Sequence, residues 1–500
     1  MIASATPGNR NGRALSRPHI RRPATRVAGR TTKPESASDA LVIVANRLPI
    51  TITSDGAVER SPGGLASALS SVVTEGSHWI GWTGQVGAPT SPLPDDGLTL
   101  HAVPLTAAEV DGYYDGFANS VLWPLFHNRL QQPELRRSWW RTYRHVNQHF
   151  ADMVVEVAPP GALVWVHDYH LLLVPAMVRA RRRDLRVGLF SHIPFPGPRL
   201  FGTLPWRREL LLGMADAHVI GFQTEDDVHN FQDAMHRFVG PLRRGRRGAS
   251  VVDAFPISVD VAKWAALGDD ASAGATALAE PGVVVYLGID RLDYTKGIVQ
   301  RLQAFGELLN DGQLDPAKCR FVQVAVPTRT DVPAYQEEKE AVEGLAERIN
   351  QRHATAGSPG PVQYLDTPLD GPELAAWYRR ADALVVTSLA DGMNLVAKEF
   401  VSARTDLDGA VVLSEFAGAA HDMPGAIIVN PYDIEAIKRA MVDVFRMSPM
   451  ERHERMSTMR DAVEANDVHH WARRFVERLR AAPVARPFRF PGRAGGRVAS

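Results

Sequence analysis

The chain has 500 residues, of which 45% are hydrophobic and 22% are charged, and this composition is typical of a globular protein with about two to four domains. Basic and acidic residues balance at 56 each, so nothing global indicates binding to nucleic acid or to an acidic membrane. Cys319 is the single cysteine, which excludes an intrachain disulfide framework and a cysteine-based zinc site.

The two ends of the chain have the composition of disordered segments. Residues 1–38 carry eight Arg or Lys residues against the single acid Glu35, and residues 481–500 are also basic. An Arg-rich leader is also typical of an organelle transit peptide, but Arg outnumbers Lys throughout this chain. No apolar run has the roughly 20 residues of a membrane span, and no signal peptide precedes the first strand. We therefore expect a soluble, cytoplasmic protein.

Apolar runs typical of strands alternate with helical patterns between the two tails, which predicts an α/β fold with parallel sheets covered on both faces. A break near 241–280 indicates two doubly wound, Rossmann-like domains that face each other across a cleft, with boundaries at 39–255 and 256–455. The Arg-rich stretch 243–247 in this break is expected to be a solvated loop. The predicted strands are 41–48, 162–167, 186–190, 216–222, 283–289, 320–326, 383–387, 410–414 and 426–429.

Polar residues follow six of these strands at the point where each strand ends. Open α/β sheets bind ligands at the carboxyl ends of their strands, so these side chains are predicted to line one cleft. Any one of them could instead be a core or capping residue, but six together favour a site. They are Arg47, Asp168, His192, Arg291, Arg329 and Asp391.

Several residues of the first half fit a site for phosphate. Arg47 offers a planar fork, as does Arg329 in the second half, and Tyr114 and Trp123 could add O–H and N–H donors, although core packing explains both aromatic residues equally well. The segment Ser61-Pro-Gly-Gly64 fits either a plain turn or a loop whose amides meet a phosphate.

Two segments of the second half have the pattern of a nucleotide-sugar site. Arg291 and Lys296 are cations at a strand exit beside a helix start, where the helix dipole disfavours them unless an anion lies nearby. Asp391 opens the segment Asp391-Gly-Met-Asn-Leu-Val-Ala-Lys-Glu399, and Glu399 is predicted to return to nearly the same helix face. The alternative is that Asp391 caps the helix and Glu399 is solvated.

Taken together, these motifs resemble the trehalose-6-phosphate synthase family of retaining GT-B glycosyltransferases over about residues 40–480. The motifs that carry the resemblance are Ala-Asn-Arg47, Gly63-Gly64-Leu, Tyr113-Tyr114, Val121-Leu-Trp123-Pro, His167-Asp168-Tyr-His, His192-Ile-Pro-Phe-Pro, Gly221-Phe-Gln-Thr, Arg291-Leu-Asp-Tyr-Thr-Lys296-Gly, Asp391 to Glu399 and Glu415-Phe-Ala-Gly-Ala-Ala.

The resemblance implies glucose transfer, with retention, from a nucleoside-diphosphate glucose to glucose 6-phosphate. It implies a donor site, an acceptor site and, among these residues, the catalytic set Arg291, Lys296, Asp391, His192 and Asp168. The implied donor-binding residues are Gly64, Arg291, Lys296, Asp391, Asn394, Leu395, Val396, Glu399 and His192. The implied acceptor-binding residues are Arg47, Trp82, Tyr114, Trp123, Asp168 and Arg329.

The resemblance further implies that residues 456–480 form a helix that crosses back to the first domain, that subunits associate into a homo-oligomer, and that no cofactor or metal is needed. Asp406-Leu-Asp408 matches a cation-binding pattern of other glycosyltransferases, but it falls at the wrong end of the sheet. Ala390 stands where the family commonly has Arg. UDP-, ADP- and GDP-glucose all stay open as donors. The alternatives are a transferase with another acceptor, such as glycerol 3-phosphate, and an inactive sugar-phosphate sensor.

Overall fold

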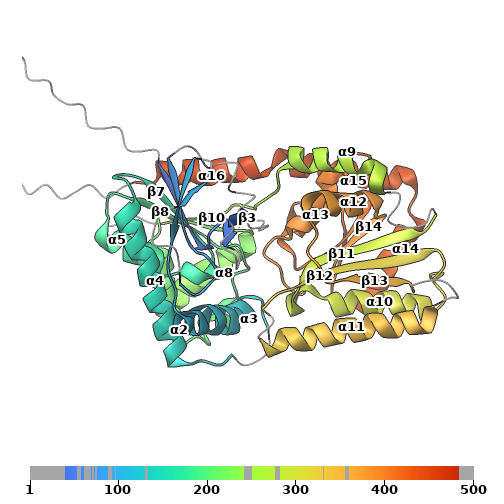
Figure 1. Cartoon of the computed structure of the whole chain (residues 1–500), viewed down its shortest axis with the longest axis horizontal. Coiled ribbons are helices and arrows are strands. Elements are labelled where there is room, and N and C mark those ends of the chain that lie inside the picture. The colour runs from blue at the N-terminus through green and yellow to red at the C-terminus, as the bar shows by residue number, and fades with distance from the viewer. Residues whose placement is uncertain are drawn as a thin grey trace, which may run out of the picture. The chain divides into compact units, whose positions relative to one another are not determined.

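Two largely parallel β-sheets organise the computed structural model (Figure 1). The structure describes residues 40–52, 58–60, 69, 73, 76–87, 93–95, 97–129, 133–240, 250–275, 282–329, 332–354 and 360–483, which belong to one compact unit. The predicted tail 1–38, residues 484–500 of the predicted tail 481–500, the predicted loop 243–247 and Gly64 therefore lie outside the described residues. Ala481, by contrast, is the last residue of a helix, so the second tail was predicted to begin too early. No helix among the described ranges is both long enough and apolar enough to cross a membrane.

The first sheet has eight strands, all parallel to their neighbours except the edge strand β5, which runs antiparallel to β6. Their order across the sheet is β10 (Val251–Ala254), β9 (Val219–Phe222), β8 (Arg186–Phe190), β7 (Leu163–His167), β1 (Leu41–Arg47), β4 (Ser77–Trp82), β6 (Leu98–Ala102) and β5 (Leu93–Asp95). A separate hairpin pairs β2 (Ile50–Ile52) with β3 (Val58–Arg60).

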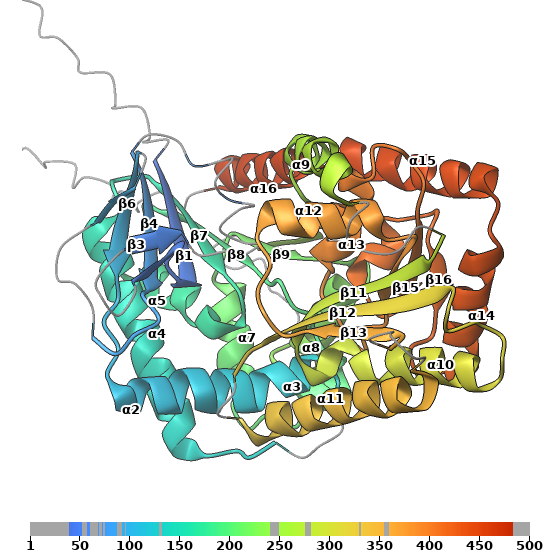
Figure 2. The same ribbon diagram turned by 45° about the vertical axis from the view of Figure 1, so that its right-hand side comes forward.

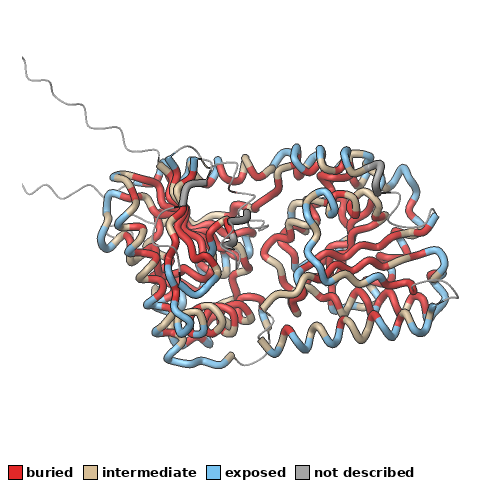
Figure 3. The backbone as a smooth tube through the Cα atoms, viewed as in Figure 1, coloured by how far each residue is buried: buried red, intermediate tan, exposed pale blue. Residues whose placement is uncertain are grey.

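The second sheet has six strands, and every neighbouring pair is parallel. Its order is β13 (Val362–Leu365), β12 (Cys319–Pro327), β11 (Val284–Leu292), β14 (Ala383–Val386), β15 (Ala410–Ser414) and β16 (Ile427–Val429). The central strands are apolar and buried along most of their length, because helices cover both of their faces (Figure 3).

Helices connect the strands and pack on the sheets (Figure 2). Those that follow the strands of the first sheet are α2 (Ala107–Glu109), η1 (Val110–Leu122), α3 (Trp123–Phe126), α4 (Arg137–Val157), η2 (Tyr169–Leu171), α5 (Val174–Arg181), α6 (Pro198–Phe201), α7 (Arg207–Ala215) and α8 (Glu225–Phe238). The remaining ones are α9 (Val261–Ala275), η3 (Tyr294–Lys296), α10 (Ile298–Asn310), α11 (Pro333–His353), α12 (Gly371–Arg380), α13 (Leu395–Ala403), η4 (Gly418–His421), α14 (Ile434–Arg446), α15 (Pro449–Ala465) and α16 (Val468–Ala481).

The last helix, α16, packs on β7, β8 and β9 of the first sheet, whereas α15 packs on β15 and α13 beside the second. The Phe475 ring stacks on Trp165 with centroids 4.4 Å apart. Gly188 and Gly221 make room for it, because a Cβ atom at these positions would lie 2.7 and 2.9 Å from the Phe475 ring. Arg186 Nε also donates a hydrogen bond of 3.1 Å to the Ala482 carbonyl oxygen.

All nine predicted strands are present, but the sequence reading missed β4, β5, β6, β10 and β13 as well as the hairpin. It was also wrong in one respect, because the antiparallel β5 makes the first sheet mixed rather than purely parallel. The missed strands are short, and several carry polar or aromatic residues in place of a continuous apolar run, as in Ser77-His-Trp-Ile-Gly-Trp82.

Candidate functional site

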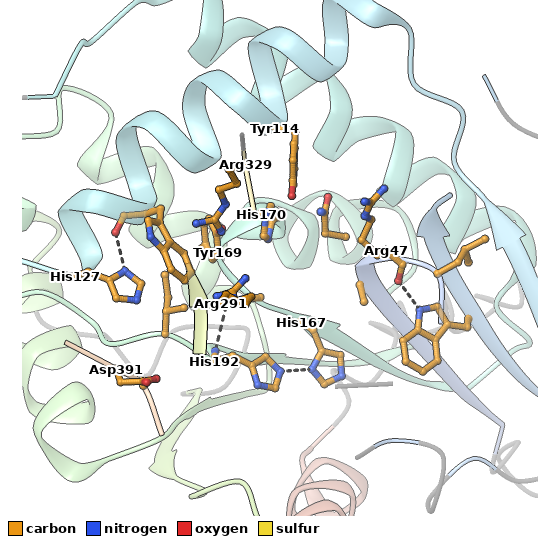
Figure 4. Close-up of a pocket in the computed structure, with 18 of the residues that line it drawn as sticks. Arg47, Tyr114, His127, His167, Tyr169, His170, His192, Arg291, Arg329 and Asp391 are labelled. Carbon is orange, nitrogen blue, oxygen red and sulfur yellow. Dashed lines mark hydrogen bonds between the residues drawn. The ribbon is translucent and has the colours of Figure 1, made fainter. Parts of the chain in front are cut away.

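A cavity of about 540 Å³ is lined by residues from the carboxyl ends of strands in both sheets (Figure 4). The prediction that the strand-end residues lie together is confirmed for all six of them. Among the described residues, the lining contains four Lys or Arg side chains against two Asp side chains, so its charge favours an anionic ligand. These charged residues are Arg47, Arg291, Lys296, Arg329, Asp168 and Asp391.

Arg47 marks one end of the cavity, where aromatic rings hold its guanidinium group. Arg47 Cζ lies 4.6 Å from the ring centroid of Trp82 and 6.0 Å from that of Tyr114. The guanidinium also fills the space beside Gly84, where a Cβ atom would lie 1.6 Å from an Arg47 nitrogen. Trp82 itself is buried behind Arg47 and is not part of the lining. The arrangement fixes a planar donor fork that suits phosphate oxygens.

The guanidinium group of Arg329 also lies beside aromatic rings, those of Trp123 and Tyr335. Its guanidinium donates to Asp293 and Tyr335, and its Cζ lies 4.1 Å from the centroid of the Trp123 ring. Arg329 has a φ of 48°, an uncommon backbone conformation for a residue other than glycine. The indole N–H of Trp123 is buried and has no hydrogen-bond partner among the described residues. A buried donor of this kind is costly unless a ligand oxygen or a water accepts from it.

Lys296 and Asp391 form an ion pair in the cavity wall. Lys296 Nζ donates to Asp391 Oδ2 at 2.6 Å, and both side chains are 13% exposed. Ser388 and Asn394 also donate to the same oxygen, at 3.2 and 3.1 Å. Burial alone would raise the pKa of Asp391, but the charge and hydrogen bond of Lys296 and the hydrogen bond from Asn394 outweigh it and lower that pKa. Asp391 is therefore ionised at neutral pH.

The structure corrects the predicted helix start after Asp391. Helix α13 begins at Leu395, and its N-cap is Asn394, which has a φ of 78° and accepts a hydrogen bond from the Ala397 N–H. Asp391 therefore neither caps this helix nor shares a helix face with Glu399. Gly392 allows two backbone segments of the protein to approach closely, because a Cβ atom there would lie 2.0 Å from the His192 carbonyl oxygen.

Four of the predicted donor residues lie on or next to α13 and outside the lining of this cavity, namely Asn394, Leu395, Val396 and Glu399. Leu395 and Val396 are half-buried and pack against the core. Glu399 accepts a 2.9 Å hydrogen bond from the Tyr378 hydroxyl. Burial raises the pKa of Glu399 to about 7, against the opposing effects of Tyr378 and Lys263. Gly64, the remaining predicted donor residue, lies outside the described residues.

Asp168, His167 and His192 also line the cavity, and Figure 4 shows the rings of His167 and His192 side by side. The His192 backbone N–H donates to Asp168 Oδ1 at 3.2 Å, and the imidazoles of His167 and His192 share a hydrogen bond of 3.0 Å. Burial lowers the pKa of His192 to about 3, and burial together with His192 lowers the pKa of His167 well below its usual value. Both imidazoles are therefore neutral near pH 7. Burial raises the pKa of Asp168 to about 6, although the Tyr169 and His192 N–H groups and Arg291 and Arg329 oppose the rise.

The raised pKa of Asp168 predicts a cost in stability at neutral pH. Because the folded-state pKa of about 6 exceeds the ordinary value of 3.8, Asp168 contributes stability below pH 3.8 that is lost as the pH rises through 6. Asp168→Asn should therefore have a higher free energy of unfolding than the wild type above about pH 6 and a similar one near about pH 4. Urea unfolding at both values measures this. A variant less stable at both would contradict the assignment.

The sequence reading assigned no role to five aromatic residues of the lining, one of which is the buried Trp79. His127, His167 and His170 are buried imidazoles, and Tyr169 is a buried phenol whose hydroxyl accepts from Arg329 at 3.3 Å. Both ring nitrogens of His170 have no partner within the part of the chain that the structure describes. His167, Tyr169 and His170 flank Asp168 in one quoted motif, so their position after β7 was the signal that could have found them.

The expectation that Asp406-Leu-Asp408 lies away from the site is consistent with its position between α13 and β15. Asp406 Oδ1 accepts from Arg404 at 2.8 Å and pairs with Arg379 at 2.9 Å, so this carboxylate is engaged in a structural ion-pair cluster. Neither aspartate is in the lining of the cavity.

Comparison with known proteins shows the family. A profile of glycosyltransferase family 20 matches residues 39–481. Trehalose-6-phosphate synthase from Mycolicibacterium gilvum (strain PYR-GCK) is 42% identical over 480 residues, which cover 89% of this chain and 94% of that protein. The enzyme of the same name from Mycobacterium bovis is 40% identical, with 88% and 94% covered.

Solved structures give the same result. An alpha,alpha-trehalose-phosphate synthase (UDP-forming) from Burkholderia xenovorans in complex with glucose-6-phosphate has a TM-score of 0.81 at 34% identity, covering 88% of this chain and 100% of that one. A structure from E. coli bound with UDP-2-fluoro glucose has a TM-score of 0.79 at 34% identity, covering 88% and 99%. This chain therefore belongs to glycosyltransferase family 20 and is an α/β glycosyltransferase with two Rossmann-like domains.

Proposed function

We propose that this enzyme transfers glucose from a nucleoside-diphosphate glucose to glucose 6-phosphate, with retention, to give α,α-trehalose 6-phosphate. The observation that carries the proposal is one cavity whose lining holds two arginines beside aromatic rings, Arg47 and Arg329, together with the Lys296–Asp391 pair. Such a cavity can hold two phosphorylated ligands at once. The relatives bound with glucose-6-phosphate and with UDP-2-fluoro glucose support the same two ligands here.

On the donor side, Arg291 and Lys296 would bind the diphosphate, while Asp391 and His192 would contact the glucose that is transferred. Both cations line the cavity, and the Arg291 side chain is exposed to it. Fixed positive charge near the leaving oxygen stabilises the negative charge that develops there as the bond to the sugar breaks. Gly64 at the diphosphate, and Asn394, Leu395, Val396 and Glu399 at the nucleoside, stay predictions. The UDP-binding relatives favour UDP-glucose among the possible donors.

On the acceptor side, Arg47, Tyr114, Trp123 and Arg329 would bind the phosphate of glucose 6-phosphate, with Trp82 as support for Arg47. The Trp123 indole N–H, which has no hydrogen-bond partner among the residues that the structure describes, supplies a further donor for this phosphate. Asp168 would accept a hydrogen bond from a hydroxyl of the acceptor sugar. Asp168 lines the same cavity as both arginines of the acceptor side, and the charges of Arg291 and Arg329 act on its carboxylate.

The lining favours direct transfer on one face of the donor sugar. The acceptor hydroxyl oxygen bonds to the anomeric carbon on the side from which the diphosphate leaves, and the leaving phosphate oxygen takes the hydroxyl proton. Retaining glycosidases instead use a pair of carboxyl groups about 5–5.5 Å apart, one of them as a nucleophile. Here the Asp391 carboxylate is engaged by Lys296, which does not suit the role of a nucleophile. Arg291 and Lys296 would stabilise the charge on the leaving diphosphate without a metal ion. We therefore propose a reaction that needs no metal and no covalent intermediate on the protein. Homo-oligomer formation and a cytoplasmic location stay predictions.

Glu399 makes the proposed donor binding pH-dependent. Ribose hydroxyls that donate to Glu399 would stabilise its ionised form, whereas the free enzyme holds its pKa at about 7. Donor binding should then release a proton and become tighter as the pH rises from about 6 to about 8. Titration calorimetry with UDP-glucose should show this trend for the wild type and lose it for Glu399→Gln. An equal pH trend in both proteins would remove Glu399 from the nucleotide site.

Product mass spectrometry tests the function. The purified chain, with EDTA present, is incubated with glucose 6-phosphate and with UDP-, ADP- or GDP-glucose in turn. A phosphorylated disaccharide is the expected product. A product with glycerol 3-phosphate but not with glucose 6-phosphate would support the other transferase, and ligand binding without any product would support a sensor. Activity only after addition of a divalent cation would contradict the metal-independent reaction.

A further inference from the structure

Three side chains away from the cavity bring potential metal ligands together. Glu109 ends α2, while His145 and His149 lie one turn apart on α4, which packs against α2 (Figure 2). Their ligand atoms all lie within 4.8 Å of one another, and none of the three residues lines the cavity. We infer that Glu109, His145 and His149 form a site for a divalent transition-metal ion, with zinc as the occupant. This site takes no part in the transfer reaction.

The spacing fits a shared ion. Glu109 Oε1 lies 3.5 Å from His145 Nε2 and 3.7 Å from His149 Nδ1. A tetrahedral zinc ion with bonds of about 2.0–2.1 Å holds neighbouring ligand atoms about 3.3–3.4 Å apart. A direct hydrogen bond between a carboxylate and an imidazole would instead be about 2.7–3.2 Å. The side chain of His145 is 63% exposed, so a small rotation is enough to complete the geometry.

The ligand types select the class of metal. Imidazole nitrogen suits zinc, copper and nickel, whereas calcium and magnesium require mostly oxygen ligands. Two histidines four residues apart on a helix face present their rings to the same ion. Here that pair is His145 and His149, whose ring centroids are 4.4 Å apart. Three protein ligands leave one position of a tetrahedral ion for water.

Hydrogen bonds to Glu109 Oε2 hold the carboxylate in an orientation that suits a metal ligand. Glu109 Oε2 accepts from the Thr106 backbone N–H at 2.9 Å and from the Thr106 hydroxyl at 2.8 Å, in a capping box. These bonds leave Oε1 directed at the two imidazoles. Outer hydrogen-bond partners of this kind fix the ligands of metal sites in proteins and tune their affinity. The carboxylate side chain is only 13% exposed, so its position is well defined.

The site has a direct connection to the cavity through one helical segment. Helices α2, η1 and α3 follow each other without a break from Ala107 to Phe126, and this segment carries Tyr114 and Trp123. A metal ion at Glu109 would tie the start of the segment to α4. We therefore expect the ion to raise the thermal stability of the chain rather than to take part in the chemistry.

Isothermal titration of the full chain, free of any histidine tag, with Zn²⁺ and with Co²⁺ tests the site. We expect one saturable site per chain, visible Co²⁺ absorption bands of a four-coordinate ion, and a higher unfolding temperature with Zn²⁺. The variants are His145→Ala/His149→Ala and Glu109→Gln, of which the second keeps a side chain that can complete the capping box. Loss of an outer partner alone costs about 10- to 100-fold in affinity, so both variants should lose at least that much.

His229→Ala/His236→Ala is the matched control, because it removes two exposed histidines of another helix, α8. It should bind Zn²⁺ as the wild type does. Equal binding by the wild type and both site variants would overturn the inference, as would the absence of saturable binding in the wild type. Circular dichroism of each variant shows whether it is folded. Because the readouts are metal binding and thermal unfolding, failure of the proposed transfer reaction would leave this test unaffected.

Discussion

Arg291→Ala is expected to reduce the turnover number by about 10²- to 10³-fold, the loss typical of removing one preorganised donor to a developing negative charge. Arg291 lines the cavity, and its Cζ lies 5.5 Å from the Trp123 ring centroid. The charge of Arg291 also opposes the rise in the pKa of Asp168, so Arg291 influences a residue of the proposed acceptor side as well. Because the side chain is exposed, the variant should keep its free energy of unfolding within about 0.5 kcal/mol.

Steady-state release of the nucleoside diphosphate measures the effect of this substitution. Arg291→Lys should recover part of the rate, because a lysine restores the charge without the planar fork that binds two oxygens. Arg348→Ala, which removes an exposed arginine of α11 outside the lining, should be as active as the wild type. An unchanged rate in Arg291→Ala would contradict the role of Arg291 at the leaving diphosphate.

Open α/β sheets bind ligands at the carboxyl ends of their strands, and this general rule explains why the six charged or imidazole residues could be predicted to share one cavity. Each follows an apolar run that is buried in a sheet, and parallel strands bring their carboxyl ends to one edge. The missed strands show the limit of the same reasoning. β4 begins with Ser77 and His78 and has Gly81 before its last residue, so its partners β1 and β6, rather than a local pattern, define it as a strand.

The contacts between these residues were beyond prediction, because they depend on which side chains of distant segments meet. Nothing in the sequence indicates that the imidazoles of His192 and His167 share a hydrogen bond, or that Tyr335 of α11 contacts Arg329. Asn394 shows a second limit. Asp391 and Asn394 are both good helix caps, and the choice between them follows from Lys296, which already occupies the Asp391 carboxylate.

Lys296→Met should both abolish transfer and destabilise the fold. It leaves the Asp391 carboxylate in a wall where both side chains are 13% exposed, and removing one partner of a buried pair costs about 3–5 kcal/mol. We expect about 3 kcal/mol, the lower end of that range, because Ser388 and Asn394 still donate to the carboxylate. The pKa of Asp391, which Lys296 now helps to lower, would rise in the variant.

The double variant Lys296→Met/Asp391→Asn separates the two effects. With no charge left unpaired, its free energy of unfolding should return most of the way to that of the wild type, since neutral replacements of buried ion pairs are often tolerated. Its transfer rate should stay as low as that of the single variant, because both the cation at the diphosphate and the carboxylate at the sugar are absent. Urea unfolding and product formation, measured on the four proteins of the cycle, give the coupling energy of the pair. Recovery of stability together with activity would mean that the pair is structural alone, whereas recovery of stability without activity assigns the ion pair to the reaction.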